Sequence, residues 1–266
     1  MSTFASGLLQ GKTAYIAGGT SGINLGIAHG LAAAGAKVAV ISRKIDKVEA
    51  AVAELKASGA ESLGWAADVR DYAAVEQTLR SMHEAWGLID IVVSGAAGNF
   101  LAPALGMSAN AFKTVIDIDL LGTFNVLRAS HQFLRKPGAS LISITAGQAV
   151  NATLFQSHVC AAKAGINMLT KVLAMEWGPE GIRVNAIAPG PIAGTEGMAR
   201  ITPTLEAEAA LKATIPLREY GTKQDIADLA LYLASNSAKY ITGAILDCDG
   251  GSSLGRGQQP APGSAR

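Results

Sequence analysis

A glycine-rich segment near the start of the chain has the residue types and spacing of a phosphate-binding turn. Residues 17–24 read AGGTSGIN and lie between an apolar, β-branched run and a stretch of helical periodicity. Backbone N–H groups at such a helix start can bind a pyrophosphate, assisted by the helix dipole. A purely structural βα turn contains similar glycines, but placement after the first strand favours a nucleotide site. The expected contacts are Gly18, Thr20, Ser21, Gly22 and Ile23.

Basic residues after the second predicted strand indicate which nucleotide this site binds. Residues 40–44 read VISRK. A site that prefers NAD usually places a carboxylate here, on the adenine ribose 2′-hydroxyl. This chain instead has Ser42, Arg43 and Lys44, which suit a 2′-phosphate. We therefore expect NADP(H); the alternative is a solvated basic helix start.

The hydrophobic pattern predicts the scaffold that positions these residues. Short β-branched runs alternate with Ala-rich amphipathic stretches, which indicates βαβ units and a parallel sheet. We expect an α/β fold, a Rossmann-type doubly wound parallel sheet in a single domain at residues 1–254, and a disordered tail at 255–266. The predicted strands are 13–17, 37–41, 62–66, 89–94, 140–145, 183–187 and 244–247. The predicted helices are 23–34, 44–58, 72–86, 109–134 with an interruption near Gly122, 159–177 and 223–234, and residues 193–217 form an excursion with one amphipathic piece.

The composition argues against several classes of protein. Of the 266 residues, 49% are apolar and 16% are charged, and the net charge is +1 at pH 7. This balance indicates neither a nucleic-acid partner nor a membrane surface. No secretory signal, membrane-spanning run or Ser-Lys-Leu address is visible, so we expect a cytoplasmic location. Cys160 and Cys248 have no metal-ligand spacing; we expect free thiols and no metal site.

Four further segments carry a resemblance to a known family. Residues 68–69 read DV, 95–98 read GAAG, 156–165 read QSHVCAAKAG and 189–192 read PGPI. Together with the glycine-rich turn, in this order and spacing, they resemble the short-chain dehydrogenases/reductases over roughly residues 9–251. The family usually has a third glycine where Asn24 stands, and Asn where Gly95 stands, so helix–strand packing is expected to differ here. The resemblance implies that the cofactor also contacts Asp68, Val69, Ala96, Ala97, Gly98, Pro189, Gly190 and Ile192.

The catalytic positions of that family are largely changed in this chain. The usual set is Asn, Ser, Tyr and Lys, and the matching positions here hold Asp119, Ala146, Val159 and Lys163. Val159 carries no proton to give. A cofactor site that lacks the usual acid points away from carbonyl reduction and towards reduction of a carbon–carbon double bond.

One subgroup resembles the chain in more detail. Residues 98–103 (GNFLAP), 110–119 (NAFKTVIDID) and 190–197 (GPIAGTEG) are similar to peroxisomal-type 2,4-dienoyl-CoA reductases. Those enzymes lack the Tyr, carry Asp in place of Asn, and use NADPH to convert a 2,4-dienoyl-CoA to a 3-enoyl-CoA. The mitochondrial type uses a Tyr near the place of Gln148, so that type does not fit. The resemblance implies an acyl-CoA substrate and a homotetramer built through the two longest helices and the C-terminal strand.

The chemistry of that reaction is compatible with these residues. Hydride enters a dienoyl thioester at the far carbon, charge spreads to the thioester oxygen as a dienolate, and a proton is later added at C2. The reaction needs a positioned nicotinamide, donors for the enolate oxygen and a proton source. Under this reading Lys163 holds the nicotinamide ribose, and Asp119 donates the proton through water. Asn99 and Phe100 are the expected thioester and acyl contacts.

Several questions stay open at the level of sequence. Burial would favour a neutral Asp119, whereas a neighbouring ammonium would favour its carboxylate. Catalysis by His158, and a lid formed by the excursion at 193–217, are further possibilities. The competing functions are reduction of another activated alkene, NADP binding without catalysis, and ordinary carbonyl reduction, which Val159 and Ala146 disfavour. Other substrate or CoA contacts to consider are Ser143, Thr145, Gln148, Arg200 and Lys212.

Overall fold

Seven parallel strands form one sheet in the computed structural model, which describes residues 4–5 and 7–254. The order across the sheet is β3-β2-β1-β4-β5-β6-β7, so the chain reverses its direction of travel between β1 and β4. This confirms the predicted doubly wound parallel sheet. The strands are β1 (Thr13–Ala17), β2 (Lys37–Ser42), β3 (Ser62–Ala66), β4 (Ile91–Ser94), β5 (Ser140–Ile144), β6 (Arg183–Pro189) and β7 (Ile245–Cys248).

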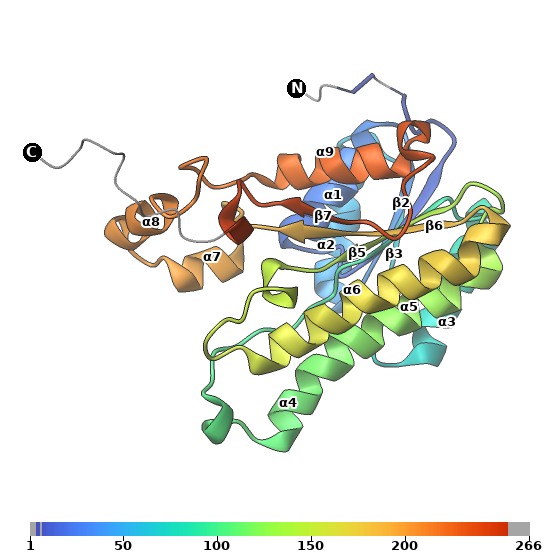
Figure 1. Cartoon of the computed structure of the whole chain (residues 1–266). Helices are drawn as coiled ribbons and strands as arrows, with labels where there is room; N and C mark the ends of the chain where they lie inside the picture. Colours follow the sequence, from blue (N-terminus) through green and yellow to red (C-terminus); the bar gives the residue numbers. More distant parts are fainter. Residues whose placement is uncertain (1–3, 6, 255–266) are drawn as a thin grey trace, which may run out of the picture.

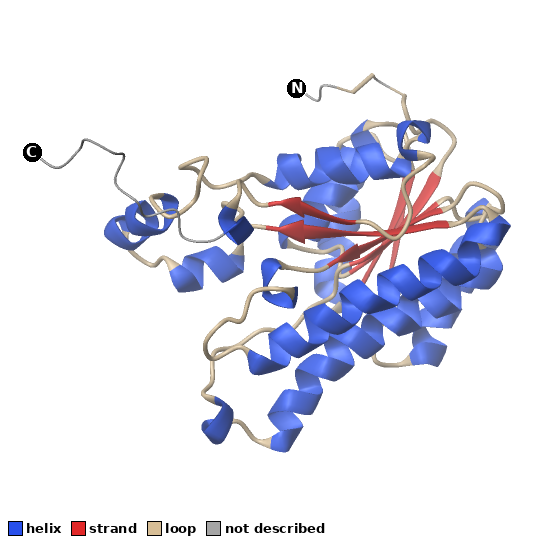
Figure 2. Ribbon diagram, in the orientation of Figure 1, coloured by secondary structure: helices blue, strands red, loops and turns tan. Residues whose placement is uncertain are grey.

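Helices cover both faces of the sheet and make a three-layer structure (Figure 2). One face carries α1 (Gly22–Ala33), α2 (Ile45–Ala57) and α9 (Lys223–Ala234); the other carries α3 (Tyr72–Trp86), α5 (Gly122–Ser130) and α6 (Ser157–Trp177) (Figure 1). Alternate side chains of β1 enter the two cores, with Ile16 on the α1 side and Tyr15 on the α3 side. Because both faces are buried, the strands read as continuous apolar runs.

The stretch predicted as a long helix with an interruption near Gly122 is helical throughout. It consists of α4 (Ala109–Val115), a π-helical segment (Ile116–Leu121) and α5. The predicted interruption near Gly122 corresponds to this π-helical segment, which ends at Leu121, while Gly122 itself has ordinary helical angles, φ −60° and ψ −41°. The glycine serves packing instead: a Cβ there would lie 2.6 Å from Val69 Cγ2. The wider π turn just before it contains Asp119, and such turns are frequent at functional sites.

The excursion after β6 contains two short helices, not the single amphipathic piece that was predicted. They are α7 (Glu196–Ile201) and α8 (Leu205–Lys212). Each begins at a threonine whose hydroxyl accepts a backbone hydrogen bond, Thr195 from Met198 and Thr204 from Ala207. Two caps nine residues apart specify two helix starts. Both helices project beyond the carboxyl ends of β6 and β7 (Figure 1).

The other predicted boundaries agree with the structure to within about two residues. In the part of the chain that is described, no helix is both long and apolar enough to cross a bilayer. The predicted tail at 255–266 lies outside the described residues, so the domain boundary at 254 stays a prediction.

Candidate active site

Two adjoining cavities lie at the carboxyl ends of β1 and β4, where the sheet order reverses. Ligands of open α/β sheets bind at such a switch point. The first cavity has a volume of about 320 Å³ and lies over the glycine-rich turn and the end of β2. The second, of about 410 Å³, lies over α6, β6 and α7. Both are lined by Asn24, Gly95 and Ala97, so they form one continuous site.

The glycine-rich turn leaves its backbone donors available. Gly18 and Gly22 both have positive φ angles, +78° and +58°. Ser21 makes no side-chain capping bond at the start of α1, so the first N–H groups of this helix keep their hydrogen-bonding capacity. A Cβ on Gly22 would meet no atom within 4 Å, which leaves open space over the helix start. This geometry fits the pyrophosphate of a dinucleotide.

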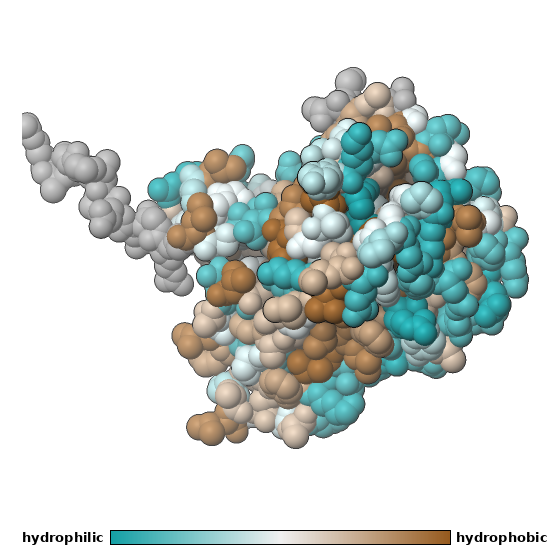
Figure 3. All heavy atoms as spheres, turned by 45° about the vertical axis from the view of Figure 1, so that its right-hand side comes forward, coloured by the Kyte–Doolittle hydropathy of each residue, from teal (hydrophilic) through white to brown (hydrophobic). Residues whose placement is uncertain are grey.

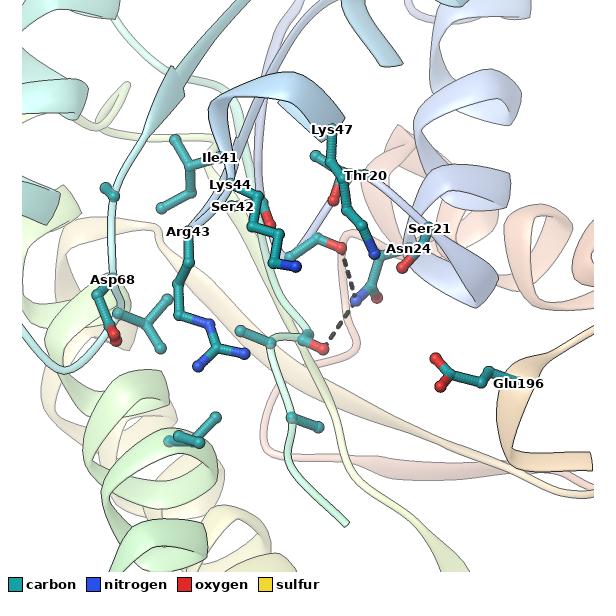
Figure 4. A pocket seen from close by; sticks show the side chains of 17 residues that line it. Thr20, Ser21, Asn24, Ile41, Ser42, Arg43, Lys44, Lys47, Asp68 and Glu196 are labelled. Atoms are coloured by element: carbon teal, nitrogen blue, oxygen red, sulfur yellow. Dashed lines mark hydrogen bonds between the residues drawn. The ribbon is translucent and has the colours of Figure 1, made fainter. Parts of the chain in front are cut away.

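Asn24 fits in its position because its side chain forms hydrogen bonds and because Gly95 has no side chain. Its Nδ2 donates to the carbonyl oxygens of Gly18 at 3.3 Å and Gly95 at 2.7 Å (Figure 4). A Cβ on Gly95 would lie only 2.1 Å from Asn24 Oδ1. Asn24 thus ties the glycine-rich turn to the end of β4.

Cations gather at the end of the first cavity. Arg43, Lys44 and Lys47 point into it from the β2–α2 connection and the first turn of α2 (Figure 4). Sequence reasoning missed Lys47; its position four residues after Arg43, one helical turn along α2, could have indicated it. Asp68 accepts hydrogen bonds from the backbone N–H of Arg70 and from its guanidinium, with Nε 3.0 Å from Oδ1 and Nη2 2.6 Å from Oδ2. The Arg70 guanidinium holds the pKa of Asp68 below its usual value, so this carboxylate is charged at neutral pH.

A buried ion pair lies in the second cavity. Asp119 Oδ1 accepts a hydrogen bond from the backbone N–H of Gly98 at 2.7 Å. Its Oδ2 lies 3.1 Å from Lys163 Nζ, and the side chains are only 1% and 7% exposed. The Lys163 ammonium also donates to the carbonyl oxygen of Ile144 at 3.1 Å. Apart from this ionic contact, the buried Oδ2 accepts no aligned hydrogen bond from any described residue, so it keeps the capacity to accept one.

Comparison with known proteins agrees with the fold and the order of the motifs. Residues 17–253 match the family model described as Enoyl-(Acyl carrier protein) reductase. A solved structure of a short chain dehydrogenase from Bacillus anthracis superposes with a TM-score of 0.85 at 37% identity, covering 95% of this chain and 100% of that one. The chain belongs to the short-chain dehydrogenase/reductase family.

Two curated relatives within this family are similar over most of their length. A peroxisomal 2,4-dienoyl-CoA reductase of Rattus norvegicus, named as (3E)-enoyl-CoA-producing, is 43% identical over 251 residues, which is 94% of this chain and 86% of the rat protein. A Saccharomyces cerevisiae protein with the same activity in its name is 42% identical, covering 92% of this chain and 85% of its own.

The short-chain dehydrogenase/reductase position that usually supplies an acid is apolar here, and Val159 forms part of the wall of the second cavity. Val159 is 4% exposed and packs against Val115 and Ala162. Ala146 lines the cavity at the position of the usual serine and offers no hydroxyl. The charged residues among the described lining of this cavity are Asp119, Lys163 and Glu196.

His158 does not line either cavity. It is fully buried, and its ring lies 4.2 Å from that of Phe100, centroid to centroid. Burial lowers the pKa of His158, while the charge of Asp119 and the backbone of Phe100 act in the opposite direction. The ring is therefore neutral at pH 7 and packs as an aromatic side chain.

The structure brings nearly all the predicted site residues together. Around the first cavity lie Gly18, Thr20, Ser21, Arg43, Lys44, Asp68, Val69, Ala96 and Ala97. Around the second lie Gly22, Ile23, Gly98, Asn99, Asp119, Lys163, Pro189, Gly190 and Ile192. Phe100 is the exception, because it lines neither cavity and contacts His158 instead.

The residues considered as other substrate or CoA contacts differ in where the structure places them. Thr145 donates its hydroxyl to the Lys163 carbonyl at 3.3 Å, so it is already engaged. Arg200 and Lys212 form ion pairs along their own helices, with Glu196 and Glu208. Residues that line the site and were missed include Lys47, Ile118 and Glu196.

Proposed function

We propose that this protein is an NADPH-dependent 2,4-dienoyl-CoA reductase that forms a (3E)-enoyl-CoA. The observation that carries the proposal is the buried Asp119–Lys163 pair in a cavity without a tyrosine or serine hydroxyl. A carbonyl reductase needs an acid on the oxygen that becomes an alcohol, and the residues around the pair offer none. The names of the rat and yeast relatives support the same reaction.

The residues divide the work between charge stabilisation and proton delivery. Bound NADPH would supply the hydride, which adds to C5 of the dienoyl thioester and leaves a dienolate. The Lys163 ammonium holds the nicotinamide ribose and adds positive potential to the cavity. Asp119 passes a proton through a water to C2 of the substrate, which forms the product, and solvent returns a proton to Asp119. Gly98 N–H keeps the carboxylate of Asp119 in place.

Preference for NADPH over NADH is part of the proposal. Arg43, Lys44 and Lys47 surround the position that an adenine ribose 2′-phosphate would take. The nearest acidic residue at that end, Asp68, is neutralised by Arg70. A 2′-phosphate therefore meets cations on several sides.

The acyl-CoA chain would lie in the second cavity. Apolar side chains from three elements line it: Val159 on α6, Ile192 after β6, and Met198 with Ile201 on α7. An unsaturated acyl chain can bury its surface against them. The α7–α8 segment then acts as a lid over the acyl group, as one of the sequence readings suggests.

Turnover with a defined substrate tests the proposal. We expect the wild type to oxidise NADPH in the presence of trans,trans-2,4-hexadienoyl-CoA, with a (3E)-enoyl-CoA product identified by mass spectrometry and NMR. Asp119→Ala and Lys163→Ala should each lower kcat by about a hundredfold or more. Activity on crotonyl-CoA alone would favour another activated alkene, and NADPH binding without any turnover would favour a non-catalytic protein.

Self-association as a homotetramer is also proposed. Apolar side chains gather on the face formed by α5 and α6 (Figure 3). Exposed apolar residues on these helices are Phe124, Met168, Val172 and Met175, the last 81% exposed. An apolar face of this kind marks a protein contact, and a second copy is the occupant we propose. The cytoplasmic location stays a prediction, since the names of the rat and yeast relatives say peroxisomal.

A further inference from the structure

A chain of three side-chain amides runs behind the second cavity. Gln148 Nε2 donates to Gln156 Oε1 at 3.2 Å, and Gln156 Nε2 donates to Asn99 Oδ1 at 3.1 Å. Gln148 and Asn99 line the cavity, whereas Gln156 does not and is only 4% exposed. The buried amide thus connects two cavity residues that come from different loops.

The direction of this chain sets which atom Asn99 presents. A side-chain amide has one acceptor oxygen and one donor NH₂ group. Because Gln156 occupies the oxygen of Asn99, the NH₂ group is what remains for the cavity. No hydrogen bond joins Asn99 Nδ2 to another described residue. Asn99 lines the same cavity as Asp119 and Lys163, and it directly follows Gly98, whose N–H binds Asp119.

Further contacts hold the same two loops together. The N–H of Ala102 donates to the carbonyl oxygen of Phe155 at 3.0 Å, and the ring of Phe100 packs on His158. Phe155 has a φ of +65°, a left-handed conformation that is costly for an aromatic residue. Such strain persists only where surrounding contacts over-determine it, and it turns the chain directly before Gln156.

We propose that Gln156 is a positioning residue that orients the Asn99 amide so that its NH₂ group donates to the thioester oxygen of the substrate. This inference rests on the proposed dienoyl-CoA reduction. Negative charge collects on that oxygen in the dienolate, so a donor fixed in advance is worth more in the transition state than in the ground state. A freely turning Asn99 would present its oxygen part of the time, and that oxygen would repel the developing charge.

Gln156→Glu separates orientation from packing. Glutamate has nearly the same shape but only accepts hydrogen bonds, so Asn99 must turn its NH₂ group towards residue 156 and its oxygen towards the substrate. We expect kcat with hexadienoyl-CoA to fall about 10- to 100-fold, with the KM for substrate and the Kd for NADPH changed less than threefold. Gln156→Met keeps the length of the side chain but removes its hydrogen bonds to Gln148 and Asn99. The Asn99 amide can then turn freely, so kcat should fall by only about fivefold. Gln77→Glu, an exposed change of the same type on α3, is the matched control and should leave activity unchanged.

A double-mutant cycle shows whether Gln156 acts through Asn99. In an Asn99→Ala background, Gln156→Glu should cause no further loss of kcat, because no amide is left to turn. Equal loss in both backgrounds, an unchanged kcat in Gln156→Glu, or a larger loss in Gln156→Met than in Gln156→Glu would overturn the inference while the reductase proposal stands. A wild type without turnover of dienoyl-CoA would overturn the reductase proposal itself. If circular dichroism shows that Gln156→Glu does not fold, the same double-mutant cycle with Gln156→Met and Asn99→Ala tests whether Gln156 acts through Asn99.

Discussion

Asn24 occupies the volume that the absent side chain of Gly95 leaves free. Its Nδ2 bonds the Gly95 carbonyl at 2.7 Å, and a Cβ on Gly95 would approach its Oδ1 to 2.1 Å. Short-chain dehydrogenases/reductases usually have Gly at the position of Asn24 and Asn at the position of Gly95, which is the reverse of this chain. The side chain that joins the glycine-rich turn to the end of β4 has therefore moved from the strand to the helix.

The reversed placement of Asn and Gly predicts that substitutions at positions 24 and 95 have strongly non-additive effects on the free energy of unfolding. Gly95→Asn alone should destabilise the fold by about 1–3 kcal/mol, because the new side chain collides with Asn24. Asn24→Gly/Gly95→Asn should recover most of that loss, since the pair then has the usual family arrangement. Urea unfolding of the two single variants and the double variant measures the coupling. Additive losses would show that the two side chains do not share one volume.

The buried ion pair predicts that single replacements destabilise more than a double replacement. Asp119→Asn leaves the Lys163 ammonium buried without a carboxylate, and Lys163→Met leaves the Asp119 carboxylate buried without an ammonium. Either change should lower the free energy of unfolding by about 3–5 kcal/mol. The double variant removes both charges and should be more stable than either single variant. Thermal unfolding in the absence of ligand checks this order. A double variant that is the least stable of the three would contradict it.

Cofactor preference is predicted to depend on Arg43 and Lys47. Arg43→Ala should raise the KM for NADPH about 10- to 100-fold by removing a charge-assisted contact to the 2′-phosphate. Lys47→Ala should raise it about fivefold, and neither change should affect the KM for NADH. Lys56→Ala, at the far end of α2 and outside the cavity lining, is the control. Equal effects on NADH and NADPH would argue against a 2′-phosphate site.

His158 predicts a loss of stability in acid. Burial lowers its folded-state pKa below the ordinary value of 6.5, so the unfolded chain binds this proton more readily. The stabilisation is present above about pH 6.5 and decreases as pH falls below it, by up to about 1.4 kcal/mol per pH unit. His158→Phe should therefore lose less stability than the wild type between pH 7 and 5. Parallel stability curves for the two proteins would exclude this role of His158.

The proposed assembly predicts that a charge on α6 dissociates the protein. Val172→Glu places a carboxylate on the exposed apolar face of α5 and α6, where burial against a second copy would strip it of water. We expect a tetramer for the wild type and a smaller species for Val172→Glu, by light scattering after size exclusion. Lys56→Glu on the opposite side of the sheet should stay tetrameric. A monomeric wild type would refute the assembly proposal.

Local signals were enough to predict most of the scaffold. The bounds of β1, α3 and α9 agree with the sequence-based ranges because periodicity and end signals coincide there. Asp71 caps α3 by accepting from Ala74 N–H, and Thr222 with Asp225 forms a capping box at α9. For the stretch 109–134 periodicity predicted a helix, but the π-helical form of the segment before Gly122 and the contact of Gly122 with Val69 depend on packing against other elements.

The amino-acid sequence by itself determined the alternating α/β pattern, the glycine-rich turn, the basic end of β2 and the loss of the usual acid at Val159. Each of these depends on neighbours within a few residues, where helix and strand periods hold. Only the tertiary structure decided that Asn24 fills the space at Gly95, that Asp119 meets Lys163, and that Gln156 holds Asn99. The first and last of these hydrogen bonds join residues 71 and 57 positions apart, and such contacts depend on how helices pack on the sheet, which sequence spacing does not encode.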